Sequence, residues 1–257
     1  MFESKCSNMV GTPFRLDRSG DWRSFGGWVY GGRMHVKICG IRDTGEARLA
    51  VQAGADALGV IVGARHPTPD ELCASAAEKI FCGVPAGVSR FLVTHLGQAS
   101  EILDLLKRVP ADVVQLHGAI ADGQIERLRA AVGPRVRFVR VVHVIDRGAI
   151  DLARIAGCDG DAVVLDTRCG EQVGGTGRVH DWEISRSICR MTSVPVYLAG
   201  GLRAANVRTA IHRVRPYGVD VNSGVERLDG SKCEVSVREF VREARRAWLE
   251  LPGADMA

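Results

Sequence analysis

Short apolar runs alternate along this chain with segments that carry hydrophobic residues at helical spacing. Eight runs follow one another from residue 35 onward, and each has the length of a single strand: 35–39, 57–62, 89–93, 112–116, 137–142, 161–166, 195–199 and 218–222. Successive runs start roughly 20 to 35 residues apart, which is the length of one strand plus one crossover helix. This alternation predicts βαβ units that share a parallel sheet.

The segments between the runs have the pattern of helices that pack on such a sheet. Between residues 98 and 109, Ile102, Leu105 and Leu106 fall on one helical face and charged residues lie between them. A second clear helical pattern covers 235–249. Eight units without a break in composition favour an α/β fold made of one (β/α)8 TIM barrel over residues 34–250, rather than a doubly wound sheet. In such a barrel the functional side chains lie at the carboxyl ends of the strands.

The two ends of the chain lack this periodicity. Residues 1–33 are rich in Gly, Ser, Arg and Trp, and we interpret them as a disordered leader or as the product of a start codon assigned too early. The alternative is an arm that caps the bottom of the barrel. Residues 251–257 are expected to form a flexible tail. No apolar run reaches the roughly 18 to 20 residues that cross a bilayer, and the N-terminus lacks the apolar centre of a signal peptide, so we expect no membrane association.

Composition narrows the function classes. The 257 residues include 34 basic and 30 acidic side chains, a formal charge of +4, without a block of like charge in the middle of the chain. Nucleic-acid binding usually needs a concentrated basic face, so we do not expect it, whereas a small positive excess suits a small anionic substrate. The eight cysteines form no C-x-x-C pair. This pattern favours reduced thiols in the cytoplasm over a disulfide framework or a metal site.

Two of the strand ends carry side chains suited to proton transfer. Cys39 ends the first run and Asp166 ends the sixth. If both runs are parallel strands of one barrel, the thiol and the carboxylate face a shared substrate, which suits acid–base chemistry without metal or cofactor. Each residue also has a plainer interpretation, because a free cysteine is often a small buried hydrophobe and an aspartate can cap a helix. Their shared position at strand ends favours an acid–base pair.

Glycine-rich turns follow the seventh and eighth runs. Gly200 and Gly201 come after the seventh, and Asn222, Ser223 and Gly224 come after the eighth. Glycine lets backbone N–H groups approach an anion closely, and these are the loops in which barrels commonly hold phosphate. Either turn alone could be an ordinary tight turn, but the two together predict a phosphate site.

Two further features have open interpretations. The segment Gly174-Gly175-Thr176-Gly177 lies in a long loop after the sixth run, which could be a lid over the substrate or a simple flexible connection. Gln115 and His117 share one parity of the fourth run, so both could point into the barrel toward a ligand. A hydrogen-bonded core histidine is the alternative for His117. His95 and His143 have no comparable context.

Seven signatures, in order from about residue 35 to 245, closely resemble the phosphoribosylanthranilate isomerase family. They are Val36-Lys37-Ile38-Cys39-Gly40, Gln115-Leu116-His117-Gly118, Leu165-Asp166-Thr167, Gly174-Gly175-Thr176-Gly177, Asp181-Trp182, Leu198-Ala199-Gly200-Gly201-Leu202 with Asn206, and Asp220-Val221-Asn222-Ser223-Gly224-Val225-Glu226. The resemblance implies a (β/α)8 barrel that performs an Amadori rearrangement in tryptophan biosynthesis. The substrate would be N-(5-phosphoribosyl)anthranilate and the product 1-(2-carboxyphenylamino)-1-deoxyribulose 5-phosphate, with no cofactor.

The resemblance also implies roles for individual residues. Asp166 would be the general acid that protonates the furanose ring oxygen and opens the ring to a Schiff base. Cys39 would then remove the C2 proton to give an enolamine, which tautomerises to the ketone. The two glycine turns would hold the substrate phosphate. The expected contacts to the rest of the substrate come from Lys37, Arg65, Gln115, His117 and Asp220.

The chain departs from the family pattern in places that bear on the substrate. After the second run the family usually has a Ser-x-Arg segment whose arginine meets the anthranilate carboxylate, whereas here Arg65 is the nearest cation in a longer loop. Asn222 stands where serine is usual, and Cys233 where aspartate is common. An arginine that pairs with a carboxylate through two hydrogen bonds is strongly position-dependent, so its displacement could change which aryl group is accepted.

Alternatives to the isomerase stay open. One is a divergent paralogue from secondary metabolism that isomerises a related aryl-amine phosphoriboside. Another is a phosphosugar-binding barrel without turnover, against which the presence of both Cys39 and Asp166 argues. A histidine-pathway isomerase is disfavoured because an aspartate is expected there in place of Cys39. We expect a monomer or a homodimer.

Overall fold

The computed structural model of the protein describes residues 33–169, 172–173 and 179–251. Residues 1–32 of the predicted leader and 252–257 of the predicted tail lie outside the described residues. The eight apolar runs form eight parallel strands, each within one or two residues of its predicted bounds. They are β1 (His35–Ile38), β2 (Ala57–Ile61), β3 (Ser89–Thr94), β4 (Val113–Leu116), β5 (Arg137–His143), β6 (Ala162–Asp166), β9 (Val196–Leu198) and β10 (Gly218–Val221).

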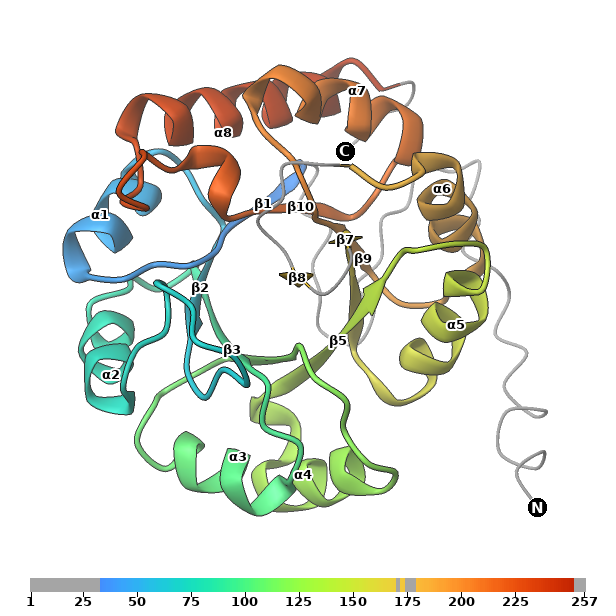
Figure 1. The fold of residues 1–257 in the computed structure, drawn as a ribbon. Helices are drawn as coiled ribbons and strands as arrows, with labels where there is room; N and C mark the ends of the chain where they lie inside the picture. Colours follow the sequence, from blue (N-terminus) through green and yellow to red (C-terminus); the bar gives the residue numbers. More distant parts are fainter. Residues whose placement is uncertain (1–32, 170–171, 174–178, 252–257) are drawn as a thin grey trace.

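These strands close into a barrel in the order β1-β10-β9-β6-β5-β4-β3-β2. The TIM-barrel prediction is therefore confirmed, and the doubly wound alternative is wrong because β1 pairs with both β2 and β10. Within the described residues eight α-helices follow the strands, and Figure 1, a view along the barrel, shows the helices arranged around it. They are α1 (Thr44–Gln52), α2 (Ala74–Cys82), α3 (Ala99–Leu106), α4 (Gln124–Val132), α5 (Ala149–Asp159), α6 (Trp182–Met191), α7 (Ala204–Val214) and α8 (Glu234–Leu249).

Alternation along each strand divides the core into an inner and an outer layer. The inner layer is small and is built from side chains that point into the lumen, among them Phe91, Val139 and Tyr197. The outer layer is larger and packs the other parity of each strand against the helices, with Val36 and Leu165 as examples. Both layers are buried, which explains why the strands are almost continuously apolar in sequence.

The bottom of the barrel, where the strands begin, is closed by ion pairs around a buried aspartate. Asp56 precedes β2 and is only 5% exposed. Its carboxylate accepts hydrogen bonds from the Val36 backbone N–H at 2.7 Å, from Arg33 Nη2 at 2.6 Å and from Arg245 Nη2 at 2.7 Å. The carboxylate therefore ties β1 and β2 to α8, and both of its oxygens are used.

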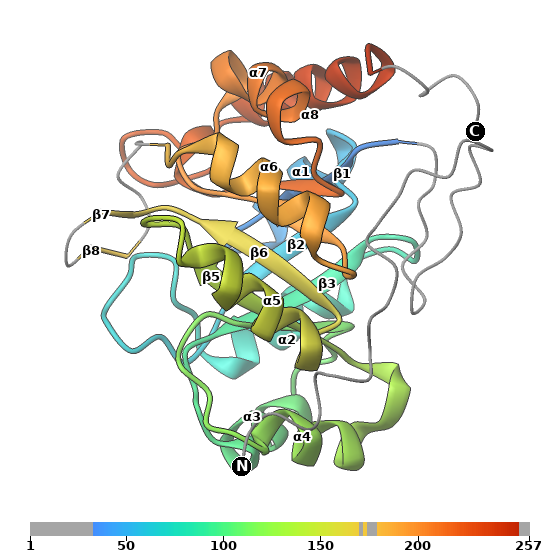
Figure 2. The ribbon, with the colours of Figure 1, turned by 90° about the vertical axis from the view of Figure 1, so that its right-hand side faces the viewer.

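Two loops extend from the opposite end, where the strands finish. The β6–α6 connection carries a short antiparallel pair, β7 (Arg168–Cys169) and β8 (Gln172–Val173), which the sequence did not predict. Figure 2 shows that this pair and the connection between β2 and α2 project from the same end of the barrel. Among the described residues, no helix is long and apolar enough to span a membrane.

Candidate active site

Five of the predicted site residues meet inside the barrel at the carboxyl ends of its strands. Lys37 on β1, Gln115 on β4, Asp166 on β6 and Asp220 on β10 are all less than 9% exposed, and Cys39 directly follows β1 at 7% exposure. Lys37 and Asp220 are register partners across the β1–β10 seam that closes the barrel. Residues that are up to 183 positions apart in sequence thus share one small lumen.

Lys37 is the central group of this cluster. Its Nζ donates to Asp220 Oδ2 at 2.8 Å and is also hydrogen-bonded to the Cys39 thiol. Gly59 on β2 makes this arrangement sterically feasible, since a Cβ there would lie 2.7 Å from Cys39 Sγ and 3.0 Å from Lys37 Nζ. A glycine inside a strand often marks a place where other atoms approach the backbone closely. Gly59 is such a residue of the site, and it is absent from the predicted set.

Burial and the neighbouring charges set the protonation states of Lys37 and Cys39. Burial lowers the pKa of Lys37, but Asp220 and Cys39 outweigh it and leave the pKa raised, so the ammonium stays charged. Burial raises the pKa of the Cys39 thiol, and the Lys37 ammonium opposes that rise only in part. Without substrate the thiol is therefore mostly protonated at neutral pH, and the adjacent ammonium is the group that can stabilise its thiolate.

Asp166 lies across the lumen in a different environment. Burial raises its pKa to about 6, although the Thr167 backbone N–H donates to Asp166 Oδ1 at 2.8 Å and favours the ionised form. The negative charge of Asp220 adds to the rise. A carboxyl group with a pKa near 6 holds its proton in a useful fraction of molecules at neutral pH, which is the property a general acid needs.

Three histidines continue from Asp166 toward the β3 side of the mouth. The His117 ring lies 4.9 Å from that of His95 and 5.4 Å from that of His143, between ring centroids. Burial, reinforced by the two neighbouring rings, lowers the pKa of His117 to about 3. The 3.8 Å contact between His117 Nε2 and Asp166 Oδ2 therefore joins a neutral ring to the carboxyl group and is not an ion pair. His95 follows β3 and His143 ends β5, and neither has a motif in the sequence that predicts a role.

Two buried polar atoms in the lumen lack a hydrogen-bond partner. They are Gln115 Oε1 and Asp220 Oδ1. Gln115 is 2% exposed and Asp220 is 6% exposed, so bulk water does not satisfy either atom. Buried acceptors without donors are uncommon in folded proteins, and here they are available to a ligand that brings hydroxyl or N–H groups.

The two predicted phosphate turns lie against each other beside this lumen. Gly200 and Gly201 follow β9 with φ values of +81° and +65°, which favour glycine. After β10 a 3-10 turn, Ser223–Val225, brings Gly224 so close to Leu202 that a Cβ on Gly224 would overlap the Leu202 carbonyl. Ser223 and Gly224 are exposed to solvent. The turns thus form one continuous glycine-lined surface.

Asn222 has a more specific position than predicted. Its Nδ2 donates to Asp70 Oδ2 at 2.8 Å, and its Oδ1 accepts from the fully buried Lys232 Nζ at 2.5 Å. Lys232 also pairs with Glu226 at 2.6 Å. The amide therefore links the end of β10 to the connection between β2 and α2. The Asn222 amide has a second Nδ2–H, so a phosphate contact through it need not break either bond.

Arg65 lies apart from the lumen cluster, at a cavity of about 530 Å³ over the ends of β3, β4 and β5. Arg65 and its neighbour His66 are exposed residues of the β2–α2 connection. The cavity has a cationic and imidazole side and an apolar side, and its lining includes Arg65, His66, His95, His117, His143, Ile145, Leu152 and Ile155. Partial burial is the largest cause of the lowered pKa of His95, and the neighbouring His66 and Arg65 add to it.

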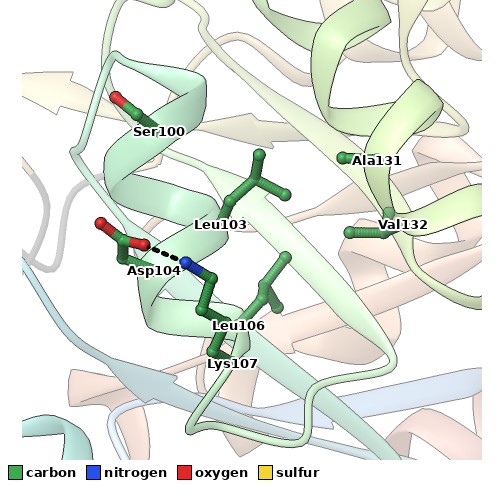
Figure 3. Close-up of a pocket in the computed structure, with 7 residues that line it drawn as sticks. All are labelled: Ser100, Leu103, Asp104, Leu106, Lys107, Ala131 and Val132. Atoms are coloured by element: carbon green, nitrogen blue, oxygen red, sulfur yellow. Dashed lines mark hydrogen bonds and ion pairs between the residues drawn. The ribbon is translucent and has the colours of Figure 1, made fainter.

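A second hollow lies outside the barrel, between α3 and α4. Figure 3 shows Leu103 and Leu106 of α3 opposite Ala131 and Val132 of α4, with the Asp104–Lys107 ion pair at the rim. None of the predicted site residues lines it. This hollow is a groove between neighbouring helices and is separate from the candidate active site.

The proposed lid, a possible metal site and Cys233 are the remaining features raised by the sequence. The proposed lid segment 174–177 lies outside the described residues. Among the residues that the structure describes, no group of three or more His, Cys, Asp or Glu side chains could hold a metal ion. Cys233 lies at the N-terminus of α8, as expected for a residue that affects the start of a helix.

Comparisons with known proteins agree with this arrangement. Residues 36–243 match the family model described as N-(5'phosphoribosyl)anthranilate (PRA) isomerase. The chain is 39% identical over 220 residues to N-(5'-phosphoribosyl)anthranilate isomerase 2 of Methanosarcina mazei, a match that covers 85% of this chain and 97% of that protein. It is also similar to the solved structure of N-(5'-phosphoribosyl)anthranilate isomerase from Pyrococcus furiosus, with a TM-score of 0.70 and 32% identity over 83% of this chain and 99% of that chain.

A further solved structure bears on the ligand. It is a phosphoribosyl anthranilate isomerase in complex with reduced 1-(o-carboxyphenylamino)-1-deoxyribulose 5-phosphate, with a TM-score of 0.65 and 30% identity. The match covers 83% of this chain and 99% of that chain.

Proposed function

The chain belongs to the N-(5'-phosphoribosyl)anthranilate isomerase family, and we propose that it performs this isomerisation with Asp166 as general acid and Cys39 as general base. The reaction is the Amadori rearrangement of tryptophan biosynthesis. The observation that carries the proposed roles is the shared lumen, in which a carboxyl group with a pKa of about 6 and a thiol hydrogen-bonded to Lys37 face the same space. Lys37 and Asp220, which are also buried at the strand ends, are joined to each other by a 2.8 Å ion pair.

The reaction only relocates protons and electron pairs within the substrate and needs no external electron donor or acceptor. Asp166 gives its proton to the furanose ring oxygen, the C1–O bond breaks, and the substrate nitrogen forms a protonated Schiff base with C1. Cys39 then takes the proton from C2, and the electron pair of that C–H bond flows toward the cationic nitrogen to give an enolamine. Tautomerisation of the enolamine, in which C1 gains a proton and the C2 hydroxyl loses one, yields the C2 ketone. The Cys39 thiol gives up the proton it took, and the Asp166 carboxylate takes one up, through the product and solvent.

Lys37 and Asp220 prepare the thiol for this step. The Lys37 ammonium lies between the Cys39 thiol and the Asp220 carboxylate, so it stabilises the thiolate at the moment the proton is shared. The free acceptors Gln115 Oε1 and Asp220 Oδ1 would receive the ribose hydroxyls or the substrate N–H. The Gln115 contact would position the substrate without adding a competing base, since an amide side chain does not titrate.

The substrate would lie across the mouth with its two anionic ends in different places. The phosphate would bind to the turns at Gly200, Gly201 and Gly224, where backbone approaches closely. The aryl carboxylate would lie toward Arg65 and the cavity at the ends of β3 to β5. Apolar side chains such as Leu152 and Ile155 give that cavity a surface suited to an aromatic ring.

The experiment that tests this function is growth of a host that lacks the isomerase on medium without tryptophan. We expect residues 34–257 to restore growth and the purified protein to consume N-(5-phosphoribosyl)anthranilate. An expressed, folded protein that fails both assays would contradict the assignment. Cys39→Ala expressed at the same level is the matched negative control.

A second candidate substrate is favoured by one observation, the composition of the cavity beside Arg65. His66 and His95 line this cavity beside an arginine that is displaced from the usual family position, so a modified aryl amine could be accepted. Turnover of analogues without the carboxylate separates the two cases. Anthranilate specificity predicts that kcat/KM collapses without the carboxylate, whereas a divergent paralogue would keep most of it.

The wider context of the enzyme is part of this proposal. We propose a small anionic phosphosugar as its only partner in catalysis, a cytoplasmic location, and a monomeric or homodimeric state. Light scattering of the purified protein distinguishes the two states, and cell fractionation tests the location.

A further inference from the structure

His180 lies beside the candidate acid but has no part in the chemistry described above. It stands two residues before α6 and one before Asp181, which caps that helix by accepting from the Glu183 N–H at 2.9 Å. The ring is partly exposed, yet most of it is surrounded by protein, and burial lowers its pKa to about 4. His180 is therefore a neutral imidazole at physiological pH, with one N–H donor and one acceptor nitrogen.

Both ring nitrogens are bonded to hydroxyl groups. Nδ1 lies 2.9 Å from Thr167 Oγ1, and Nε2 lies 2.5 Å from Ser185 Oγ. Ser185 is fully buried on α6 and Thr167 is 5% exposed at the end of β6. Hydroxyls can donate or accept, so either tautomer of the ring satisfies both bonds. The imidazole thus connects the end of β6 to the first turn of α6.

Thr167 is in contact with two parts of the candidate active site. Its backbone N–H donates to Asp166 Oδ1 at 2.8 Å. On its other side, Gly200 lies so close that any Cβ at Gly200 would overlap the Thr167 side chain. Other charged or titratable groups that act on Asp166 are Asp220 and Lys37, with the neutral His117 ring 3.8 Å away. A small displacement of Thr167 would therefore move both the acid and a phosphate turn.

We propose that His180 is a positioning residue that holds Thr167 against the Asp166 carboxylate on one side and the Gly200 turn on the other. The inference rests on the proposed roles of Asp166 and of that turn. His180 touches neither the substrate nor the reacting atoms. It acts through Thr167, and its two hydrogen bonds fix the position of a backbone N–H that orients the acid.

The proposal has a signature that a purely structural role would not produce. Loss of the His180 bonds would loosen the Thr167 N–H from the carboxylate, and a weaker hydrogen bond to the ionised form raises the pKa of Asp166. The limb of the pH–rate profile that belongs to Asp166 would move to higher pH. Misplacement of the acid would lower kcat about tenfold to a hundredfold, and KM would change less.

The test compares His180→Phe, which keeps a planar ring but removes both bonds, with His180→Gln, which keeps a donor and an acceptor. We expect His180→Phe to lower kcat and raise the pH of the limb, and His180→Gln to restore both in part. His212→Gln, on the outer face of α7, is the matched control for replacing a histidine and is expected to behave like the wild type. A folded His180→Phe variant with wild-type kcat and an unmoved limb would overturn the proposal, whether or not it is less stable.

A second variant keeps the proposal testable if His180→Phe does not fold. Thr167→Val removes the hydroxyl that His180 binds but keeps the backbone N–H and the β-branched shape. We expect it to lower kcat and shift the limb in the same direction, and the double variant with His180→Gln to be no worse than Thr167→Val alone. Additive losses would mean that His180 does not act through Thr167, which contradicts the proposal.

A measurement without substrate separates this inference from the proposed function. NMR titration of ¹³C-labelled aspartate carboxyl groups follows Asp166 directly. If the wild type does not consume N-(5-phosphoribosyl)anthranilate, the function is wrong, yet a higher Asp166 pKa in His180→Phe would still support the positioning role. An active wild type with the same Asp166 pKa in both proteins would leave the function intact and overturn the positioning role.

Discussion

Buried aspartates at the two ends of the barrel differ in how completely their carboxylate oxygens are hydrogen-bonded. At the bottom, Asp56 accepts three hydrogen bonds, two of them from arginines, and both of its oxygens are used. At the mouth, Asp220 uses one oxygen and leaves the other without a partner. Asp166 has one backbone donor and a pKa raised to about 6 by burial. The side chains are chemically the same, but their surroundings differ.

With the proposed roles, the difference separates residues that stabilise the fold from residues that would serve the reaction. A fully paired carboxylate holds β1, β2 and α8 together and has no capacity left for a ligand. A carboxyl group with a raised pKa lowers the stability of the fold when it is ionised. Such a group at the mouth agrees with the proposed role of Asp166 as a proton donor. This contrast agrees with the general division of TIM barrels into a stabilising bottom and a functional mouth.

The contrast between the mouth and the bottom would be contradicted most strongly if Asp166 could be replaced without loss of activity. We expect Asp166→Asn and Cys39→Ala each to lower kcat by about 10³-fold or more, because each removes a group that must transfer a proton. Thermal unfolding should show that both variants remain folded. Steady-state turnover of N-(5-phosphoribosyl)anthranilate measures the loss, and activity within tenfold of the wild type in either variant would contradict the assigned role.

The same substitution at the bottom should have the reverse effect. Asp56→Asn leaves Arg33 and Arg245 facing an amide, and we expect it to lower the free energy of unfolding by about 3 kcal/mol. Its kcat, corrected for the folded fraction, should stay near the wild-type value. Urea denaturation and active-site titration measure the two quantities. A large fall in kcat with unchanged stability would show that the bottom is part of the catalytic machinery.

Asp166→Asn should also stabilise the protein, in a pH-dependent manner. The folded-state pKa of about 6 lies above the ordinary value of 3.8, so ionisation of Asp166 costs stability as pH rises through this window. The full cost is present above about pH 6 and absent below about pH 4. We expect the variant to gain on the order of 2 to 3 kcal/mol at pH 8 and nothing at pH 4. Equal stabilities at both pH values would contradict the raised pKa.

The smallest effect concerns the shape of the pH profile. Turnover requires a protonated Asp166 and an ionised Cys39, yet the pKa of the acid lies below that of the thiol. Between the two values the active fraction is small but constant, so kcat/KM should be flat and should fall below about pH 6 and above the thiol pKa. Asp166→Glu should move only the limb near pH 6. A shift of the alkaline limb instead would reverse this assignment.

The barrel could be predicted from the sequence because each of its strands is a short apolar run that can be recognised locally. Apolar runs such as 162–166 are buried on both faces. A helical crossover between successive runs requires parallel strands, which leaves few possible topologies. Cys39, Asp166 and the glycine turns could be selected because strand ends of a barrel converge. The positions of Lys37 and Asp220 follow from the same rule, since they are register partners at the seam.

What could not be predicted depends on side chains that meet across distant elements. The Asp70–Asn222 hydrogen bond joins residues 152 positions apart, and no local pattern signals it. His95 follows β3 and His143 ends β5, and the two acquire a shared context only through the His117 ring between them. The contact of His180 with Thr167 and Ser185 likewise depends on how α6 is placed against β6.

The most direct test of the account is a single-turnover measurement with substrate that carries deuterium at C2 of the ribose. If Cys39 removes that proton in the chemical step, the deuterated substrate reacts more slowly in the wild type, and the deuterium is lost to solvent through the thiol. Cys39→Ala should have almost no turnover with either isotope. An equal rate for both substrates together with appreciable turnover by Cys39→Ala would contradict the claim that the mouth of this barrel acts by acid–base transfer between Asp166 and Cys39.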